Sequence, residues 1–153
     1  MATHATLKED FETLARLHNA LWGEASDLLR GANREFLADL AAVALDCGWL
    51  RLWMLEIDGT TVAADWAFQF GDVMYAYTGR DPAWSSFGVG SALLLHLLRS
   101  AMEENLREVR WLRGDEEYKR RFTSRDAGVD RVAVTHGATG RVWLLASNGA
   151  RRR

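Results

Sequence analysis

The sequence contains only one cysteine, Cys47, among its 153 residues. A single cysteine excludes a disulfide within the chain and any zinc site built from several cysteines. Cys47 stands next to Gly48 at an expected helix end, so we predict a buried structural thiol rather than a nucleophile. The four histidines are scattered along the sequence and indicate no metal site. We therefore expect neither a disulfide nor a bound metal ion.

Long apolar segments and an excess of positive charge are also absent. No apolar run approaches the roughly 20 residues that a membrane-spanning helix needs, and the N-terminus lacks the pattern of a signal peptide. The formal net charge of −2 argues against nucleic-acid binding, which relies on a basic surface. The short basic tail does not reverse this balance. We expect a cytoplasmic protein that binds neither membranes nor nucleic acids.

The length and composition fit one globular domain. With 48% hydrophobic and 26% charged residues, the chain can bury a core of its own. We predict a single domain over residues 7–147, preceded by a flexible N-terminus (1–6) and followed by a flexible basic tail (148–153).

Seven tryptophans are a high number for this length and could form an aromatic platform for sugars or bases. Those inside predicted strands are expected to pack in the core instead: Trp53, Trp66, Trp111 and Trp143. Those near the ends of elements could line a cleft: Trp22, Trp49 and Trp84.

Apolar residues recur at helical spacing in two N-terminal segments. They predict helices over about 7–21 and 36–47, the second ending at Gly48. The polar, glycine-containing segment between them, residues 24–33, is predicted to be a loop that could cover a substrate cleft.

Alternating polar and apolar residues predict three strands at 50–57, 60–70 and 73–79. The turns Asp58-Gly59 and Gly71-Asp72 connect them, which favours an antiparallel meander. The rest of the chain predicts a long helix, a strand at 108–113, a short helix that runs to about Thr123 and a final hairpin over 129–146.

Asp65 is the first candidate for a catalytic base. Two-residue turns would place it opposite Leu52 and Thr78, among Ala63, Ala67 and Ala76. A carboxylate in that setting implies a cavity or a polar partner such as Thr78. A structural carboxylate satisfied by its neighbours is the alternative.

A glycine-rich turn, Gly88-Val89-Gly90, connects the third strand to the long helix. The first turn of a helix has unpaired N–H groups and a dipole that favours negative charge, so a phosphate could approach at residues 86–91. Tight packing of the helix on a strand would explain the glycines equally well. A P-loop is excluded because no Gly-Lys-Ser/Thr follows, and a dinucleotide motif because Leu93 replaces the third glycine.

This order of strand, turn and helix resembles the pyrophosphate-binding segment of the GNAT superfamily of acyl-CoA N-acyltransferases. From about Phe11 to Phe122 the chain is most similar to the CelD-type branch. The segments that carry this similarity are Gly48-Trp49-Leu50-Arg51-Leu52, Asp58-Gly59, Asp81-Pro82-Ala83-Trp84 and Leu112-Arg113-Gly114-Asp115-Glu116-Glu117-Tyr118-Lys119. The resemblance implies an α/β fold with a mixed, largely antiparallel central sheet and helices on both faces.

The resemblance also implies acetyl-CoA as co-substrate, with its pantetheine arm in a gap between residues 75–79 and 109–113. The expected binding residues are Tyr77, Thr78, Gly79, Arg80, Ser85, Ser86, Phe87, Gly88, Val89, Gly90 and Ser91. The superfamily usually has Arg or Gln where this chain has Ser85, and Arg80 is a candidate substitute for the missing group.

Tyr118 is the expected general acid that protonates the departing thiolate. The family places this tyrosine five residues before a phenylalanine, whereas here Phe122 follows four residues later, and packing against the sheet edge is the alternative. Asp115 fits a helix N-cap with Glu116 in the first turn. As part of the branch signature, Asp115 and Glu116 are expected to shape the acceptor site.

We therefore predict an acyltransferase that moves an acetyl or related acyl group to the amine of a small-molecule or other amine-bearing acceptor. A catalytically silent module of the same fold, which binds a partner or a glycan in polysaccharide synthesis, is the alternative that Ser85 favours. An aminoacyl-tRNA donor, as in Fem-type transferases, is disfavoured by the acidic balance. Since CelD-type proteins usually carry this region in a longer chain, we also expect a homodimer or docking to a second GNAT-like half.

Overall fold

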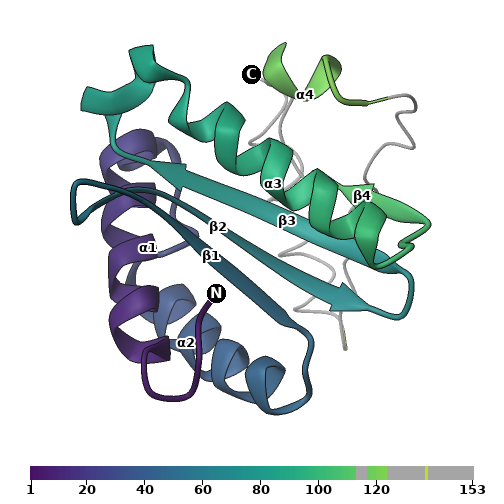
Figure 1. Cartoon of the computed structure of the whole chain (residues 1–153). Helices are drawn as coiled ribbons and strands as arrows, with labels where there is room; N and C mark the ends of the chain where they lie inside the picture. The colour runs from purple at the N-terminus through teal and green to yellow at the C-terminus, as the bar shows by residue number, and fades with distance from the viewer. Residues whose placement is uncertain (113–116, 124–136, 138–153) are drawn as a thin grey trace. The chain divides into compact units, whose positions relative to one another are not determined.

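A four-stranded sheet in the order β1-β2-β3-β4 forms the centre of the fold in a computed structural model of the chain (Figure 1). The first two pairs of neighbours, β1 with β2 and β2 with β3, are antiparallel, and β3 pairs with β4 in parallel. The strands are β1 (Leu50–Ile57), β2 (Thr60–Phe70), β3 (Val73–Arg80) and β4 (Glu108–Arg110). The predicted meander is therefore confirmed.

The structure describes residues 1–112, 117–123 and 137. The chain divides into two compact units, Met1–Gly114 and Asp115–Arg153. The sheet and most of the described helices belong to the first unit. The predicted hairpin over 129–146, Trp143 and the basic tail lie outside the described residues, and the single domain over 7–147 stays a prediction.

Helices α1 (Leu7–Trp22) and α2 (Gly31–Asp46) cover one face of the sheet (Figure 1). Phe11, Leu14 and Leu17 of α1 are buried in the same cluster as Trp66 of β2. Complete burial of each such side chain contributes about 1.5–3 kcal/mol to stability. The periodic apolar residues of α1 therefore pack as the sequence predicted.

Helix α3 (Val89–Glu103) covers the opposite face (Figure 1), where Leu93 and Leu97 pack against Val62, Ala63 and other buried residues of the sheet. The short helix η2 (Pro82–Phe87) precedes it. Because β2 is buried on both faces, its central residues form a nearly continuous apolar run rather than a strict alternation. The predicted mixed sheet with helices on both faces is confirmed.

A β-bulge interrupts the pairing of β1 with β2. Leu55 pairs with Ala63, but the next residue, Glu56, pairs with Thr61, so Val62 is the extra residue on β2. Such a bulge bends the strand and increases its local twist. It also places Val62 and Ala63 in the same core cluster although they are adjacent in sequence.

The bulge changes the partner predicted for Asp65 on β1. Two-residue turns alone would place Leu52 opposite it, and this prediction is wrong because Val62 advances β2 by one position, so that Trp53 is the partner. On the other side the pairing of Asp65 with Thr78 is confirmed.

Helix α2 meets the sheet through only part of its apolar residues, with Leu37 packed against the core cluster. Ala41 and Ala44 are buried, whereas Phe36 and Val43 are 64% and 54% exposed. Cys47 is exposed as well, so the prediction of a buried thiol is wrong. Alanine fits here because its small side chain allows the helix to lie close to the strands.

Three predicted boundaries need correction. The loop over 24–33 is shorter, because η1 (Gly23–Ala25) takes up its beginning and α2 starts at Gly31. The strand predicted over 108–113 is β4 and ends at Arg110.

The helix predicted to reach Thr123 is α4 (Glu117–Arg120), which lies in the second unit. It ends earlier because the N–H of Phe122 and the hydroxyl of Thr123 both donate to the carbonyl of Lys119, at 3.0 and 2.7 Å, and close a terminal turn.

The tryptophans divide largely as predicted. Trp53 and Trp66 are buried in the two core clusters, and Trp111, just beyond the end of β4, packs against the cluster under α3. Near the element ends, Trp49 is exposed, and Trp22 and Trp84 are half-buried.

The first six residues make contacts in this structure. The N–H of Ala2 donates to the carbonyl of Leu52 at 2.9 Å, and Thr3 and Thr6 are hydrogen-bonded to one another. The flexibility expected for residues 1–6 stays a prediction. No helix in the described residues combines the length and apolarity needed to cross a membrane.

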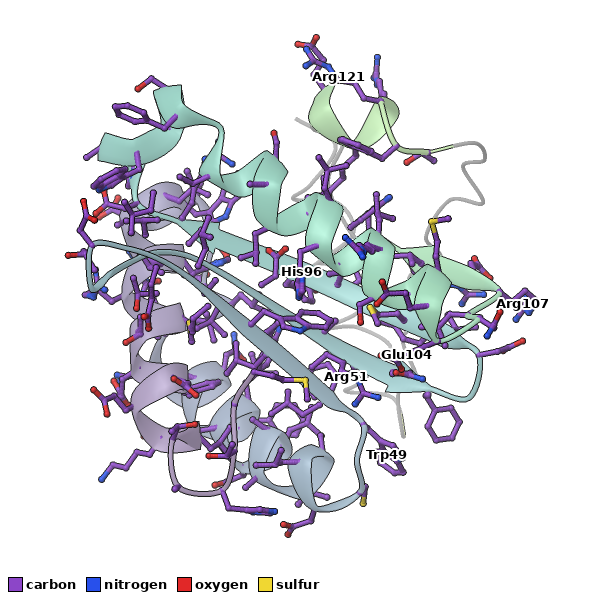
Figure 2. The ribbon with its side chains drawn as sticks, in the orientation of Figure 1. Trp49, Arg51, His96, Glu104, Arg107 and Arg121 are labelled. Atoms are coloured by element: carbon purple, nitrogen blue, oxygen red, sulfur yellow. The ribbon has the colours of Figure 1, made fainter. Side chains whose placement is uncertain are left out.

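Arg51 and Glu104 connect the start of β1 to the end of α3. Figure 2 shows the two side chains together, and Arg51 Nη2 donates to Glu104 Oε2 at 3.2 Å. Arg51 also donates to the carbonyl of Gly48 at 2.8 Å, and Ser100 donates to Glu104 at 3.2 Å. Partial burial raises the pKa of Glu104, but hydrogen bonds and charge from Arg51, with smaller contributions from Ser100 and Gln69, outweigh it, so the pKa is lowered.

Glu104 is therefore expected to contribute pH-dependent stability. A lowered folded-state pKa stabilises the fold fully above the ordinary glutamate pKa of about 4.3, and the contribution is lost as the pH falls through the folded-state value. Glu104→Gln should reduce the free energy of unfolding at pH 7 by about 1 kcal/mol or less, as for other half-exposed ion pairs. Urea unfolding at pH 7 and pH 3 measures this.

Glu103→Gln is the matched control, because Glu103 bonds only the exposed Arg99 of the same helix among the described residues. It should have a smaller effect with less dependence on pH. Equal effects of the two variants at both pH values would contradict the role of the Arg51–Glu104 pair.

Candidate functional site

The parallel pairing of β3 with β4 is short. It consists of Val73↔Glu108, Met74↔Val109 and Tyr75↔Arg110, after which β3 continues to Arg80 with no described strand beside it on that edge. Leu112 has a left-handed backbone (φ 55°), which turns the chain after β4. The gap predicted between residues 75–79 and 109–113 therefore begins after Tyr75, and Arg113 lies outside the described residues. A strand edge of this kind offers backbone N–H and C=O groups to a ligand.

Helix α1 lies directly against β3 at Gly79. A Cβ at Gly79 would be 3.0 Å from the backbone N of His18 and 3.2 Å from its Cα, which is closer than a side chain tolerates. Gly79 is therefore needed for the contact between helix and strand. This contact holds the end of α1 beside the second half of β3, beyond its described pairing with β4.

Two local features lead the chain from β3 into α3: the Asp81-Pro82 start of η2 and the left-handed turn at Gly88. Asp81 Oδ1 accepts a hydrogen bond from the N–H of Ala83 at 2.9 Å, and Pro82 stands at the first position of η2. Gly88 has a left-handed backbone (φ 69°) and lies between η2 and α3. Only glycine adopts this conformation at no steric cost, so the first glycine of the motif is explained by the turn.

The first turn of α3 has no side-chain cap. Its N–H groups and the positive end of the helix dipole therefore remain available to an acceptor or an anion. The helix start predicted at Gly88-Val89-Gly90 is confirmed; binding of an anion there stays a prediction.

Arg80 lies over this first turn. Its Nε donates to Ser85 Oγ at 3.4 Å. A Cβ built on Gly90 would be 3.2 Å from both Cδ and Nη1 of Arg80. The guanidinium thus occupies the space that a side chain at position 90 would fill.

The structure brings the predicted donor-site residues into one continuous stretch. Tyr77, Thr78, Gly79 and Arg80 end β3, Ser85, Ser86 and Phe87 end η2, and Gly88, Val89, Gly90 and Ser91 begin α3. Tyr77 packs toward the α1 face, at 6.5 Å from the Trp66 ring. The side chain of Thr78 lies outside the description.

Asp65 lies on the α3 face of β2, the face that its alternate neighbours Ala63 and Ala67 share. It is 1% exposed. An acceptor amine could contact this carboxylate only through an opening on that face, and its role as a base stays a prediction. The other predicted catalytic residues belong to the second unit: Tyr118 lies in α4 with its side chain outside the description, and Asp115 and Glu116 lie outside the described residues.

His18 is a candidate that the sequence analysis did not single out. It is 5% exposed, and its Nε2 lies 2.9 Å from Ser26 Oγ, which also accepts the N–H of Leu28 at 3.3 Å. Asn19 Nδ2 donates to the carbonyl of Leu29 at 3.2 Å. The adjacent α1 residues His18 and Asn19 therefore hold the segment between α1 and α2 in place next to the end of α1. The available signal was a titratable residue on an otherwise apolar helix face.

The described residues contain no group of three or more side chains able to bind a metal ion.

Comparison with known proteins gives a family. The acetyltransferase (GNAT) domain matches residues 2–120. This chain belongs to the GNAT acetyltransferase family. No curated protein sequence matches the chain.

Solved GNAT-fold structures agree with this family. A predicted acetyltransferase from Clostridium acetobutylicum, solved with acetyl-CoA, has a TM-score of 0.65 at 14% identity and covers 86% of this chain and 92% of its own. An aminoglycoside 6′-N-acetyltransferase from Acinetobacter haemolyticus has a TM-score of 0.59 at 14% identity, with coverages of 90% and 96%. An aminoglycoside acetyltransferase from an uncultured soil metagenomic sample, in complex with sisomicin, has a TM-score of 0.57 at 16% identity, with coverages of 90% and 92%. At these identities the likeness shows the shared GNAT fold.

Gly79→Ala tests the contact of α1 with β3. The added Cβ meets backbone atoms of His18, which cannot move without shifting the helix, so we expect a loss of about 1–3 kcal/mol in the free energy of unfolding. Gly90→Ala is the matched control, because the three atoms nearest to its Cβ belong to the flexible Arg80 side chain and alanine favours a helix by up to about 1 kcal/mol. Chemical unfolding measures both, and an equal loss in the two variants would contradict the assignment of Gly79 to helix packing.

Proposed function

We propose that this GNAT-family chain transfers an acetyl or related acyl group from acyl-CoA to the amine of a small-molecule acceptor. The observation that carries the proposal is the segment that runs from β3, beyond its described pairing with β4, through η2 to the first turn of α3, where the structure gives no side-chain cap. A thioester needs backbone donors near its carbonyl and a site for its phosphates. Backbone groups of β3 and the first-turn N–H groups of α3 follow one another along this segment.

The donor would lie along residues 77–91. The pyrophosphate fits the start of α3, where free N–H groups and the helix dipole favour negative charge. The pantetheine arm fits the edge of β3 beyond Tyr75, where the pairing with β4 has ended. The relative from C. acetobutylicum, which contains acetyl-CoA, supports this choice of donor.

The reaction requires two proton transfers. The amine nitrogen attacks the thioester carbon, the C–S bond breaks, and the thiolate of CoA leaves. In our proposal Tyr118 protonates the thiolate, and a base takes the proton that the amine loses. Asp65 and His18, both nearly fully buried, are the two candidates for the base. Asp115 and Glu116 are proposed to shape the acceptor site.

The acceptor is proposed to be a small molecule with a primary amine. The aminoglycoside acetyltransferases among the solved relatives support this class of acceptor. Assignment to the CelD-type branch, a homodimer or docking to a second GNAT-like half, and a cytoplasmic location stay predictions. Only Ser85, in place of Arg or Gln, favours the alternative of a catalytically silent module, and the comparisons offer no support for it.

Acetyl-CoA is expected to raise the melting temperature of the protein. A ligand that binds only the folded state stabilises it by about 2.7 kcal/mol at a concentration of 100 times Kd. Differential scanning fluorimetry with acetyl-CoA measures the shift, and ATP at the same concentration is the control for a polyphosphate without a pantetheine arm. The absence of any shift at millimolar acetyl-CoA would refute the proposed function.

Tyr118→Phe is expected to lower turnover by about 10²-fold with little change in affinity for acetyl-CoA. Loss of a general acid slows the chemical step without removing contacts to the donor. Release of CoA thiol is measured with acceptors drawn from a panel of primary amines that includes aminoglycosides.

Tyr75→Phe is the matched control, because Tyr75 lies where β3 is still paired with β4. It should keep nearly normal turnover. If Tyr118→Phe did so as well, Tyr118 would be a packing residue only.

A further inference from the structure

The two glycines of the Gly-x-Gly motif have different physical reasons. Gly88 needs its left-handed backbone, and nothing lies within 4 Å of the position that its Cβ would take. Gly90 lies inside α3 with no left-handed backbone, where glycine costs about 1 kcal/mol relative to alanine. Apart from the backbone of α3 itself and the two neighbours in the chain, the three atoms nearest to its missing Cβ belong to Arg80: Cδ and Nη1 at 3.2 Å and Cζ at 3.9 Å. Gly90 therefore leaves room for the Arg80 guanidinium.

Arg80 occupies an electrostatically unfavourable position. A cation at the N-terminus of a helix is repelled by the positive end of the helix dipole, which costs several tenths of a kcal/mol or more. Among the described residues no carboxylate forms an ion pair with Arg80 to offset this, and its hydrogen-bond partner there is the neutral hydroxyl of Ser85. An anion between the guanidinium and the first-turn N–H groups would turn this repulsion into attraction on both sides.

Ser85 fixes the orientation of the guanidinium. Its Oγ accepts from Nε of Arg80, and this leaves the two terminal nitrogens of the guanidinium for another acceptor. An arginine presents these donors as a planar fork that matches two phosphate oxygens. Ser85 thus orients the Arg80 side chain through a hydrogen bond, and Gly90 leaves the space that this side chain occupies.

We propose that Arg80 is the cation that binds the pyrophosphate of the acyl-CoA donor, seated by Gly90 and oriented by Ser85. This inference rests on the proposed function, because it names a residue of that donor site. It gives this chain a cation from the end of β3 in place of an Arg or Gln at position 85. The loss of the usual side chain at Ser85 then does not indicate a silent site.

Isothermal titration of acetyl-CoA into Arg80→Ala tests the proposal. We expect Kd to rise about 10- to 100-fold, as for the loss of charged hydrogen bonds. Arg99→Ala is the matched control: it removes the same charge from the exposed side of α3, where Arg99 pairs with Glu103, and should leave Kd unchanged. Arg80→Lys keeps the charge and loses the fork, so its Kd should lie between those of the wild type and Arg80→Ala.

Two further measurements identify the mechanism. 3′-Dephospho-CoA retains the pyrophosphate, so Arg80→Ala should raise its Kd by the same factor as the Kd of CoA. A rise in Kd for CoA alone would show that Arg80 contacts the 3′-phosphate and would overturn the proposal. Arg80→Ala/Ser85→Arg, which returns a cation to position 85, should recover most of the affinity. Gly90→Ala should weaken binding in the wild type and have no further effect in Arg80→Ala, because the two residues act as one unit.

The outcomes separate this inference from the proposed function. Wild-type protein that binds no acetyl-CoA refutes both. Wild-type binding with an unchanged Kd in Arg80→Ala refutes only the role of Arg80 and leaves the donor site in place.

Discussion

The early end of the parallel pairing between β3 and β4 is the constraint on which the rest of the site depends. The two strands share three residue pairs, and beyond Tyr75 and Arg110 no described strand continues the ladder. The second half of β3 remains paired with β2 as far as Arg80.

Helices α1 and α3, on opposite faces of the sheet, both lie near the end of β3. Helix α1 contacts β3 through the backbone of His18 at Gly79, and α3 begins just beyond the strand, after η2. Each helix is held by its own core cluster, with Trp66 on one face and Leu97 on the other. The apolar core thus sets the positions of polar groups that contribute little to stability themselves.

Three glycines close to the site show how one residue type serves separate physical needs. Gly79 permits contact between the backbones of a helix and a strand, Gly88 permits a left-handed turn, and Gly90 leaves space for Arg80. The Gly-x-Gly motif by itself suggests that Gly88 and Gly90 together let a phosphate approach the backbone. In this structure each glycine has its own reason, and the position of a Cβ on Gly90 lies beside the side chain of Arg80, a residue outside the motif.

The order of helices and strands was determined by the sequence itself, because apolar spacing and turns such as Asp58-Gly59 depend on residues that are neighbours in the chain. The start of α3 at Gly88 followed from the same local signals. Tertiary structure decided the properties that depend on distant contacts. They include the bulge at Val62 that changes the partner of Asp65 and the burial of His18.

The same division holds for Cys47 and Arg80. The exposure of Cys47 depends on which side of α2 meets the sheet, and the seat of Arg80 over Gly90 depends on the path of η2 between them. Neither a helical period nor a motif encodes such a choice, because several packings of the same elements satisfy the same pattern. The sequence by itself therefore determined the elements and the segment proposed for the donor, and only the packing of the elements decided which side chains lie beside that segment.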